Sequence, residues 1–242
     1  MIVEFFKKLL PKGLVSRMNP PMFHIYEFLR YASKLVKKDE VLLDAGCGDS
    51  PYYNYFKHAN YVGTDFLKVD KKYDKKKMSF ISSLDNLPLI DDSVDTVLLT
   101  QVLEHVPNPE KYLKELFRVL KKGGKLFLSV PQQQEMHEEP YNFFYFTKHG
   151  LGKVLRDAGF EVRFIRPMGG YFHFLSYEIG LISRLIFPQY FKDNFLKTIL
   201  FIPYLISLFI FNFLIGLIVF HLDFLDKNKK CTFGYTCYAV KS

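Results

Sequence analysis

Two glycines one residue apart follow an acid and an apolar run, and this spacing suits the binding of a nucleotide-like ligand. The run is Val41 to Leu43, the acid is Asp44, and the glycines are Gly46 and Gly48. Glycine has no Cβ atom, so it lets a ligand approach the backbone and adopts angles that other residues avoid. An apolar run before such a turn is typical of a buried strand that leads into a ligand-binding loop.

A second acid, Asp65, ends the next apolar run, which begins at Tyr61. An acid at the tip of a second strand can accept hydrogen bonds from both hydroxyl groups of a ribose, although a turn-forming aspartate is the alternative. The dinucleotide fingerprint needs a third glycine at position 51, where this chain has Pro51. A nicotinamide oxidoreductase is therefore disfavoured.

Two histidines could act as general bases, because imidazole titrates near neutral pH. They are His105 and His137, and a structural hydrogen bond is the alternative role for each. The cysteines at positions 47, 231 and 237 have neither Cys-x-x-Cys nor Cys/His spacing. We therefore expect no disulfide framework and no metal site, and we interpret Cys47 as a small residue that fills the loop.

The elements that must position these residues alternate between strand-like and helical patterns. The pattern predicts strands at residues 41–45, 61–65, 78–81, 96–100, 125–130, 161–165 and 232–241. One helix is predicted from Asn108 to the glycines at 123 and 124, and another begins after Thr147. Strands that alternate with helices in this way predict a parallel sheet with right-handed crossovers.

In this order, the motifs resemble those of the class I S-adenosylmethionine-dependent methyltransferases of the type 11 kind. The resemblance covers about residues 38–166 and the last ten residues, and it is strongest at residues 91–109. It implies an α/β fold with a Rossmann-like, doubly wound, mostly parallel seven-stranded sheet and an antiparallel last strand. It also implies that S-adenosyl-L-methionine is the cofactor and that the chain is a methyltransferase.

The resemblance assigns roles to particular residues. It implies cofactor contacts for Asp44, Gly46, Gly48, Asp65, Phe66, Ser83, Leu84 and Gln101. His105 and His137 are the candidate catalytic bases, although the usual role of His105 in the resembled family is a structural hydrogen bond.

Two positions depart from the family pattern. Ser83 stands where relatives have an acid that meets the adenine, and a serine is a weaker partner than a carboxylate; Asp85 is the alternative partner. Residues 138–147 resemble the acceptor-side loop of methyltransferases from surface-glycan and lipid pathways. Asn142 and Tyr145 replace the usual Asp and Arg there, so we expect an acceptor that is not strongly ionic.

Residues 198–222 carry no Asp, Glu, Lys or Arg. As a helix, this run would be roughly 37 Å long, enough to cross a bilayer. A single crossing would separate the last strand from the sheet, so we expect a hairpin that enters and leaves on one side, or a segment lying flat in the interface. A buried subdomain or a homodimer interface is the alternative.

These patterns predict four segments. They are an N-terminal helical segment at 1–37, a cofactor-binding core at 38–168, a hydrophobic helical insertion at 169–230 and the last strand at 231–242. The resemblance implies that the segment at 1–37 is a lid over the cofactor.

The net charge of +8 and the lysine-rich run at 68–77 favour anionic membrane lipids over nucleic acid, because the lysines are not interleaved with aromatic residues. Residues 2–10 lack the apolar core of a secretory signal, so we expect a membrane-associated protein on the cytoplasmic side. The predicted function is methyl transfer to a hydrophobic or lipid-linked acceptor at the membrane surface. The alternative is an inactive binding or scaffold protein with the same fold.

Overall fold

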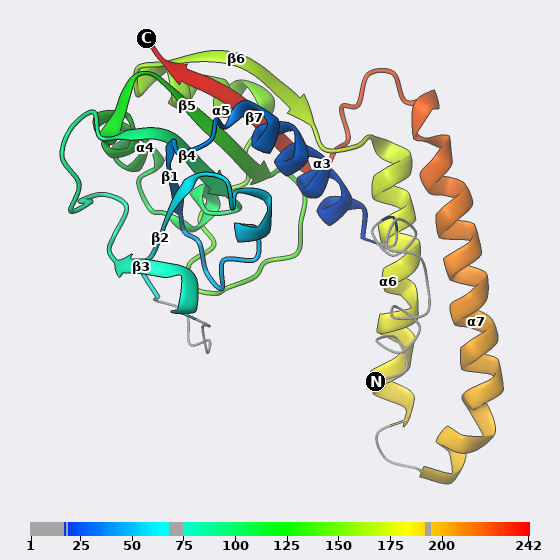
Figure 1. Ribbon diagram of the computed structural model, residues 1–242. Helices are drawn as coiled ribbons and strands as arrows, with labels where there is room; N and C mark the ends of the chain where they lie inside the picture. Colours follow the sequence, from blue (N-terminus) through cyan, green and yellow to red (C-terminus); the bar gives the residue numbers. More distant parts are fainter. Residues whose placement is uncertain (1–16, 18, 68–74, 192–194) are drawn as a thin grey trace. The chain divides into compact units, whose positions relative to one another are not determined.

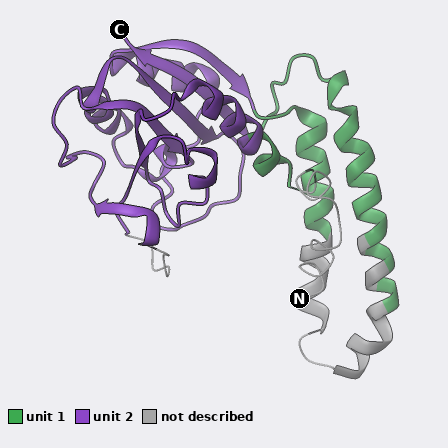
Figure 2. Ribbon diagram, viewed as in Figure 1, with its two compact units in different colours: residues 1–24, 168–233 green, residues 25–167, 234–242 purple. Residues whose placement is uncertain are grey.

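The chain divides into two compact units, shown in different colours in Figure 2. The computed structural model describes residues 17, 19–67, 75–191 and 195–242. The larger unit holds Ile25–Pro167 and Gly234–Ser242, and the smaller one holds Met168–Phe233 with the described residues up to His24. Part of the predicted N-terminal lid and most of the lysine-rich run lie outside the described residues.

The larger unit is built on one mixed sheet (Figure 1). Its strands are β1 (Val41–Ala45), β2 (Asn60–Asp65), β3 (Met78–Ile81), β4 (Val94–Thr100), β5 (Leu120–Pro131), β6 (Phe160–Pro167) and β7 (Gly234–Lys241). They lie in the order β3-β2-β1-β4-β5-β7-β6. The first five pair in parallel, and β7 is antiparallel to both β5 and β6. The predicted seven-stranded, Rossmann-like fold is therefore confirmed.

Helices cover both faces of this sheet. Successive residues of β5 point to opposite faces, and apolar residues on each face pack against a helix. Leu126 and Leu128 belong to one buried cluster with Leu113 of α4 (Pro109–Val119) and Leu151 of α5 (Lys148–Asp157). Phe127, between them, faces α3 (Pro20–Leu35), where the ring centroid of Phe28 lies 6.1 Å away. The chain thus has the layered core that a doubly wound fold requires.

The capping residues were predicted correctly, but the end of α4 was not. The Asn108 side chain accepts a hydrogen bond from the Lys111 amide at 3.1 Å and begins the helix. α4 ends at Val119, and β5 starts at Leu120 rather than after the two glycines. Gly123 has a φ of +75°, and a Cβ on Gly124 would lie 2.7 Å from the Lys121 carbonyl oxygen. The glycines therefore allow a bend within β5, where the register with β4 shifts.

The smaller unit contains two long helices that pack side by side, α6 (Tyr171–Phe191) and α7 (Phe195–His221). A short 3-10 helix, η4 (Leu222–Leu225), follows them, and three others lie in the larger unit: η1 (Tyr53–Tyr55), η2 (Lys75–Lys77) and η3 (Leu103–His105). Among the described residues, no helix has both the length and the apolar character needed to cross a bilayer.

One buried carboxylate holds the start of α6. Asp223 is 4% exposed and accepts hydrogen bonds from the Gly170 amide at 3.0 Å and the His173 amide at 3.1 Å. The Lys229 ammonium group also donates a hydrogen bond to this carboxylate. An anion at a helix N-terminus satisfies amides that have no partner within the helix and opposes the helix dipole.

We expect Asp223→Ala to destabilise the smaller unit by about 2–3 kcal/mol, because hydrogen bonds to a charged acceptor are lost. Hydrogen exchange at the first turn of α6 should become faster, while exchange in β5 should not change. Glu178→Ala is the control, since Glu178 is an exposed acid on the same helix. Equal exchange rates in the two variants would contradict the capping role.

Candidate active site

The glycine loop lies at the carboxyl end of β1, where the chain turns sharply. Gly46 and Gly48 have φ angles of +80° and +50°. The amides of Gly46 and Cys47 both donate to the Thr64 carbonyl oxygen of β2, at 2.8 and 2.9 Å. The backbone angles explain why glycine is needed at these two positions, as the sequence predicts.

Gly46 also has a packing role that the sequence does not reveal. A Cβ at this position would lie 2.4 Å from the Cγ2 atom of Val102, which follows β4. The space beside Gly46 is therefore filled by the protein itself. Close packing of the loop against Val102 is thus a second reason for glycine at this position, and the expected ligand contact stays a prediction.

Asp65 connects the glycine loop to the second strand. Its Oδ2 atom accepts a hydrogen bond from the Gly48 amide at 2.9 Å, and its Oδ1 atom accepts one from the Leu67 amide at 2.8 Å. The side chain is only half-buried. Because a carboxylate has about four acceptor positions, each oxygen keeps capacity for one more donor. The arrangement suits the two hydroxyl groups of a ribose.

Asp44 lies below the loop and is almost completely buried, at 1% exposure. Its Oδ2 atom accepts a hydrogen bond from the Tyr61 hydroxyl of β2. Burial raises the pKa of Asp44 to about 7, the Tyr61 hydrogen bond opposes this shift, and the nearby charge of Asp65 adds to it. Asp44 therefore supports the loop from within the core.

The remaining predicted cofactor residues differ in their surroundings. Leu84 is buried at 5% exposure, whereas Phe66 is 44% exposed. Ser83 donates its hydroxyl to Asp85, and Asp85 also pairs with Lys111 at 2.9 Å. The proposed alternative partner for an adenine is thus already engaged with a lysine.

Gln101 follows the last residue of β4 and has a φ of +54°. Its side-chain amide donates to the Ser129 hydroxyl of β5 at 3.1 Å. The neighbouring Thr100 hydroxyl is buried and has no hydrogen-bond partner among the described residues. Left-handed backbone at a residue other than glycine is often found at functional sites. The end of β4 thus combines a strained turn with a free polar group.

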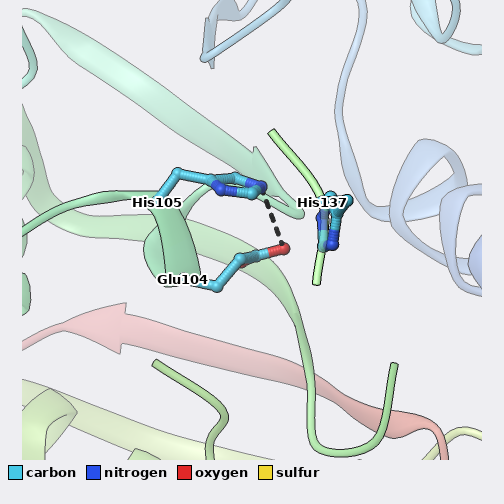
Figure 3. A group of neighbouring side chains, drawn as sticks. All are labelled: Glu104, His105 and His137. Atoms are coloured by element: carbon cyan, nitrogen blue, oxygen red, sulfur yellow. Dashed lines mark ion pairs between the residues drawn. The ribbon is translucent and has the colours of Figure 1, made fainter. Parts of the chain in front are cut away.

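Both predicted catalytic histidines lie together beside an acid that the sequence reasoning did not select (Figure 3). His105 and Glu104 belong to η3, and His137 comes from the loop between β5 and α5. The rings of His105 and His137 meet edge to face, with centroids 4.8 Å apart. The His105 Nε2 atom is 3.8 Å from Glu104 Oε1. Burial lowers the pKa of His105, which favours the neutral ring.

Sequence reasoning missed Glu104, although it is adjacent to His105 in the chain. Glu104 has no exposed surface, and neither of its side-chain carboxylate oxygens has a hydrogen-bond partner among the described residues. Tyr61 was also missed as the partner of Asp44. No sequence signal could have found either feature, because both depend on burial and on contacts between distant segments.

The sequence is similar to a known protein family and to individual proteins. Residues 43–128 match the family described as a methyltransferase domain. An uncharacterized protein of Methanocaldococcus jannaschii is 38% identical over 110 residues, which cover 45% of this chain and 48% of the relative. A protein of Mycolicibacterium smegmatis, named as a probable S-adenosylmethionine-dependent methyltransferase, is 28% identical over 57% of this chain and 58% of its own length.

The fold has counterparts among solved structures. A methyltransferase dependent on S-adenosylmethionine from Aquifex aeolicus superimposes with a TM-score of 0.50 at 20% identity, covering 65% of this chain and 92% of that one. At this identity the likeness concerns the fold alone. The chain spans about half the length of the curated relatives that it matches.

Asp44 makes the stability of the protein depend on pH. Its pKa is about 7 in the folded protein, against an ordinary value of 3.8, so folding favours the protonated acid. This contribution is complete below about pH 4 and is lost as the pH rises through 7. We expect the Asp44→Asn variant not to lose stability in this way as the pH rises, because asparagine does not ionise. Its amide oxygen still accepts the hydrogen bond from Tyr61.

Chemical denaturation at pH 5 and pH 8 measures this effect. The free energy of unfolding of Asp44→Asn, relative to the unchanged protein, should increase between these values by on the order of 2–3 kcal/mol. A difference that stays constant with pH would show that Asp44 is ionised in the folded protein throughout this range.

Proposed function

The chain carries a class I S-adenosylmethionine-dependent methyltransferase domain, and from this premise we propose that it transfers a methyl group to a hydrophobic or lipid-linked acceptor at a membrane surface. The observation that carries the proposal is the meeting of the glycine loop with Asp65 at the carboxyl ends of β1 and β2. The strand order reverses between β1 and β4, and this is the place where doubly wound folds bind their ligands.

The described residues fit S-adenosylmethionine, the cofactor of this class of domain. Asp65 would hold the ribose, since both of its oxygens can accept a further hydrogen bond. Phe66, which is 44% exposed, offers an apolar surface next to Asp65, and the Thr100 hydroxyl offers an unpaired polar group at the end of β4. When bound, the cofactor supplies a methyl group that is already activated on a sulfonium.

Because the methyl donor is already activated, the chain's contribution is to position the reactants and to accept a proton where the acceptor is a hydroxyl. His105 is suited to the second task. Its Nδ1 atom lies 2.7 Å from the Tyr141 carbonyl oxygen, so Nδ1 carries the hydrogen and donates it. The Nε2 lone pair is then free to accept a proton. The pKa of His105, lowered by burial, keeps that lone pair available.

The preference for a hydrophobic or lipid-linked acceptor rests on the smaller unit. Exposed apolar side chains follow one face of α7 at helical spacing, and they are Phe211, Leu214 and Ile218, exposed by 60%, 51% and 63%. A soluble surface rarely leaves such a stripe uncovered. The run at 198–222 has no charged residue, and lysines follow it at 227, 229 and 230. Apolar contact flanked by positive charge suits an anionic lipid surface.

The register of the sheet supports entry and exit on one side of that surface. Pro167, at the end of β6, pairs with Tyr235 at the start of β7, so the chain leaves the sheet and returns to it at neighbouring positions. A helical pair that lies at the interface between membrane and water satisfies this constraint without crossing the bilayer. We infer a location on the cytoplasmic side of the membrane, because the sheet and the lysines then remain in one compartment.

A binding or scaffold protein with the same fold is the second candidate. It is favoured by Ser83, which replaces an acid, and by Asp85, which is engaged by Lys111. Cofactor binding without turnover would support it. Incubation with labelled S-adenosylmethionine and a membrane lipid extract, followed by identification of the labelled product, tests the two candidates directly. Transfer of label to no lipid or small hydrophobic molecule would reject the proposed acceptor class.

We expect Asp65→Ala to weaken the binding of S-adenosylmethionine by about 1.5–3 kcal/mol, since the ribose and the Gly48 amide both lose a charged acceptor. Isothermal titration calorimetry measures the change. Asp157→Ala, on the exposed side of α5, is the control. Absence of binding by the unchanged protein would reject the cofactor assignment, whereas equal affinity in the two variants would reject only the ribose contact.

We expect the protein to sediment with vesicles of anionic phospholipid, and the double variant Phe211→Glu with Ile218→Glu to lose most of this binding because two carboxylates enter the apolar face. Ile90→Glu is the matched control, since Ile90 is 79% exposed in the larger unit. Equal sedimentation of the two variants would reject the α7 face as the contact. A concentration-dependent dimer that the double variant abolishes would identify a protein interface instead.

A further inference from the structure

Three potential metal ligands converge at the end of η3, on the side of the loop that joins β5 to α5. They are Glu104, His105 and His137, and one ligand atom of each lies within 4.8 Å of the others. Figure 3 shows the Glu104 and His105 side chains directed toward His137. The loop that carries His137 is attached to η3, because the Phe143 amide donates to the Glu104 carbonyl oxygen at 2.8 Å. The three side chains are thus brought together by backbone contacts as well as by the sheet.

The Glu104 carboxylate lacks a hydrogen-bond partner among the described residues. It has no exposed surface, and both of its oxygens lack a hydrogen bond to any described residue. A buried ion without a partner is costly, so such a group binds either a proton or a cation. Its surroundings already contain the histidine nitrogens that a transition metal prefers.

The two histidines are oriented as metal ligands are. The Nδ1 atom of His105 lies 2.7 Å from the Tyr141 carbonyl oxygen, and that of His137 lies 3.0 Å from the Glu135 carbonyl oxygen. A backbone carbonyl that accepts the Nδ1 hydrogen fixes the ring and leaves the Nε2 lone pair for a metal ion. Glu138 adds a second acid at the mouth of the group, 3.8 Å from the His105 Nε2 atom.

We propose that Glu104, His105 and His137 bind a divalent transition-metal ion of the zinc type, with one coordination position left open. Two imidazoles and one carboxylate form a donor set that suits Zn²⁺ and not Mg²⁺, which prefers oxygen ligands. Bonds to zinc would draw the ligand atoms to about 3.3 Å from one another. His137 lies in a loop, so this movement does not require the sheet to deform.

Metal binding at this group would occur whether or not the chain transfers methyl groups. Its chemical role, however, rests on the proposed function: a hydroxyl acceptor that occupied the open position would lose its proton more readily. His105 would then serve as a ligand instead of the base, and the proton would pass to solvent or to Glu138.

The test uses the full chain after treatment with a chelator, titrated with Co²⁺ and followed by its visible absorption, and with Zn²⁺ by calorimetry. We expect one ion per chain, and affinity at least about 10-fold lower in His137→Ala and in Glu104→Gln. His149→Ala controls for surface histidines. His24→Ala controls for the second histidine pair, in which His24 Nε2 lies 2.9 Å from His173 Nδ1.

Several results would overturn the proposal. They are the absence of Zn²⁺ binding, unchanged affinity in His137→Ala, loss of affinity in His24→Ala, or tighter binding of Mg²⁺ than of Zn²⁺. If the Glu104→Gln variant does not fold, the Zn²⁺ affinity of His137→Ala tests the proposal alone, because His137 lies in a loop. Calorimetry with S-adenosylmethionine on the same samples keeps the two ideas separate: cofactor binding without Zn²⁺ binding rejects only the metal site, and the reverse rejects only the methyltransferase proposal.

Discussion

The antiparallel pairing of β7 between β5 and β6 is the constraint on which the organisation of the chain depends. β7 comes after the whole helical excursion, yet its hydrogen bonds lie inside the sheet that the first two thirds of the chain build. Pairing of Pro167 with Tyr235 brings the two ends of that excursion together. The helical pair can therefore be long and apolar without affecting the sheet, provided that it returns to its starting point. A single passage through a bilayer would break this pairing.

The local geometry of the candidate site depends on a second constraint, which is that parallel strands end at one edge of the sheet. β1 lies between β2 and β4, so the glycine loop after β1, Asp65 at the end of β2 and Gln101 after β4 lie at the ends of three adjacent strands. The hydrogen bond from the Gly48 amide to Asp65 then links two of these strand ends. A change at either residue affects the position of the other, so the local structures of the two strand ends are coupled.

Much of the fold could be predicted because the signals are local. Asn108 and Thr147 cap helices through their own side chains, and alternation of apolar residues identifies the strands. The predicted boundary between α4 and β5 was wrong because Leu120 is apolar and fits both the helical and the strand pattern of apolar residues. The packing of Gly46 against Val102 could not be predicted, because Val102 is far away in sequence. Non-local packing of this kind leaves no trace in a single sequence.

The same limit explains why both histidines could be selected from the sequence but the acid beside them could not. A glutamate next to a histidine is usually exposed, and only the structure shows that Glu104 has no access to solvent. Glu104 can be compared with Asp44, the other buried acid near the candidate site. Both acids are buried and both have a raised pKa, but Asp44 accepts a hydrogen bond from Tyr61 and supports the fold. Glu104 has no such donor among the described residues, and two histidines held by backbone carbonyls lie beside it. Glu104 is thus a buried acid without a hydrogen-bond donor beside two imidazoles, and this arrangement favours a bound ligand over a purely packing role.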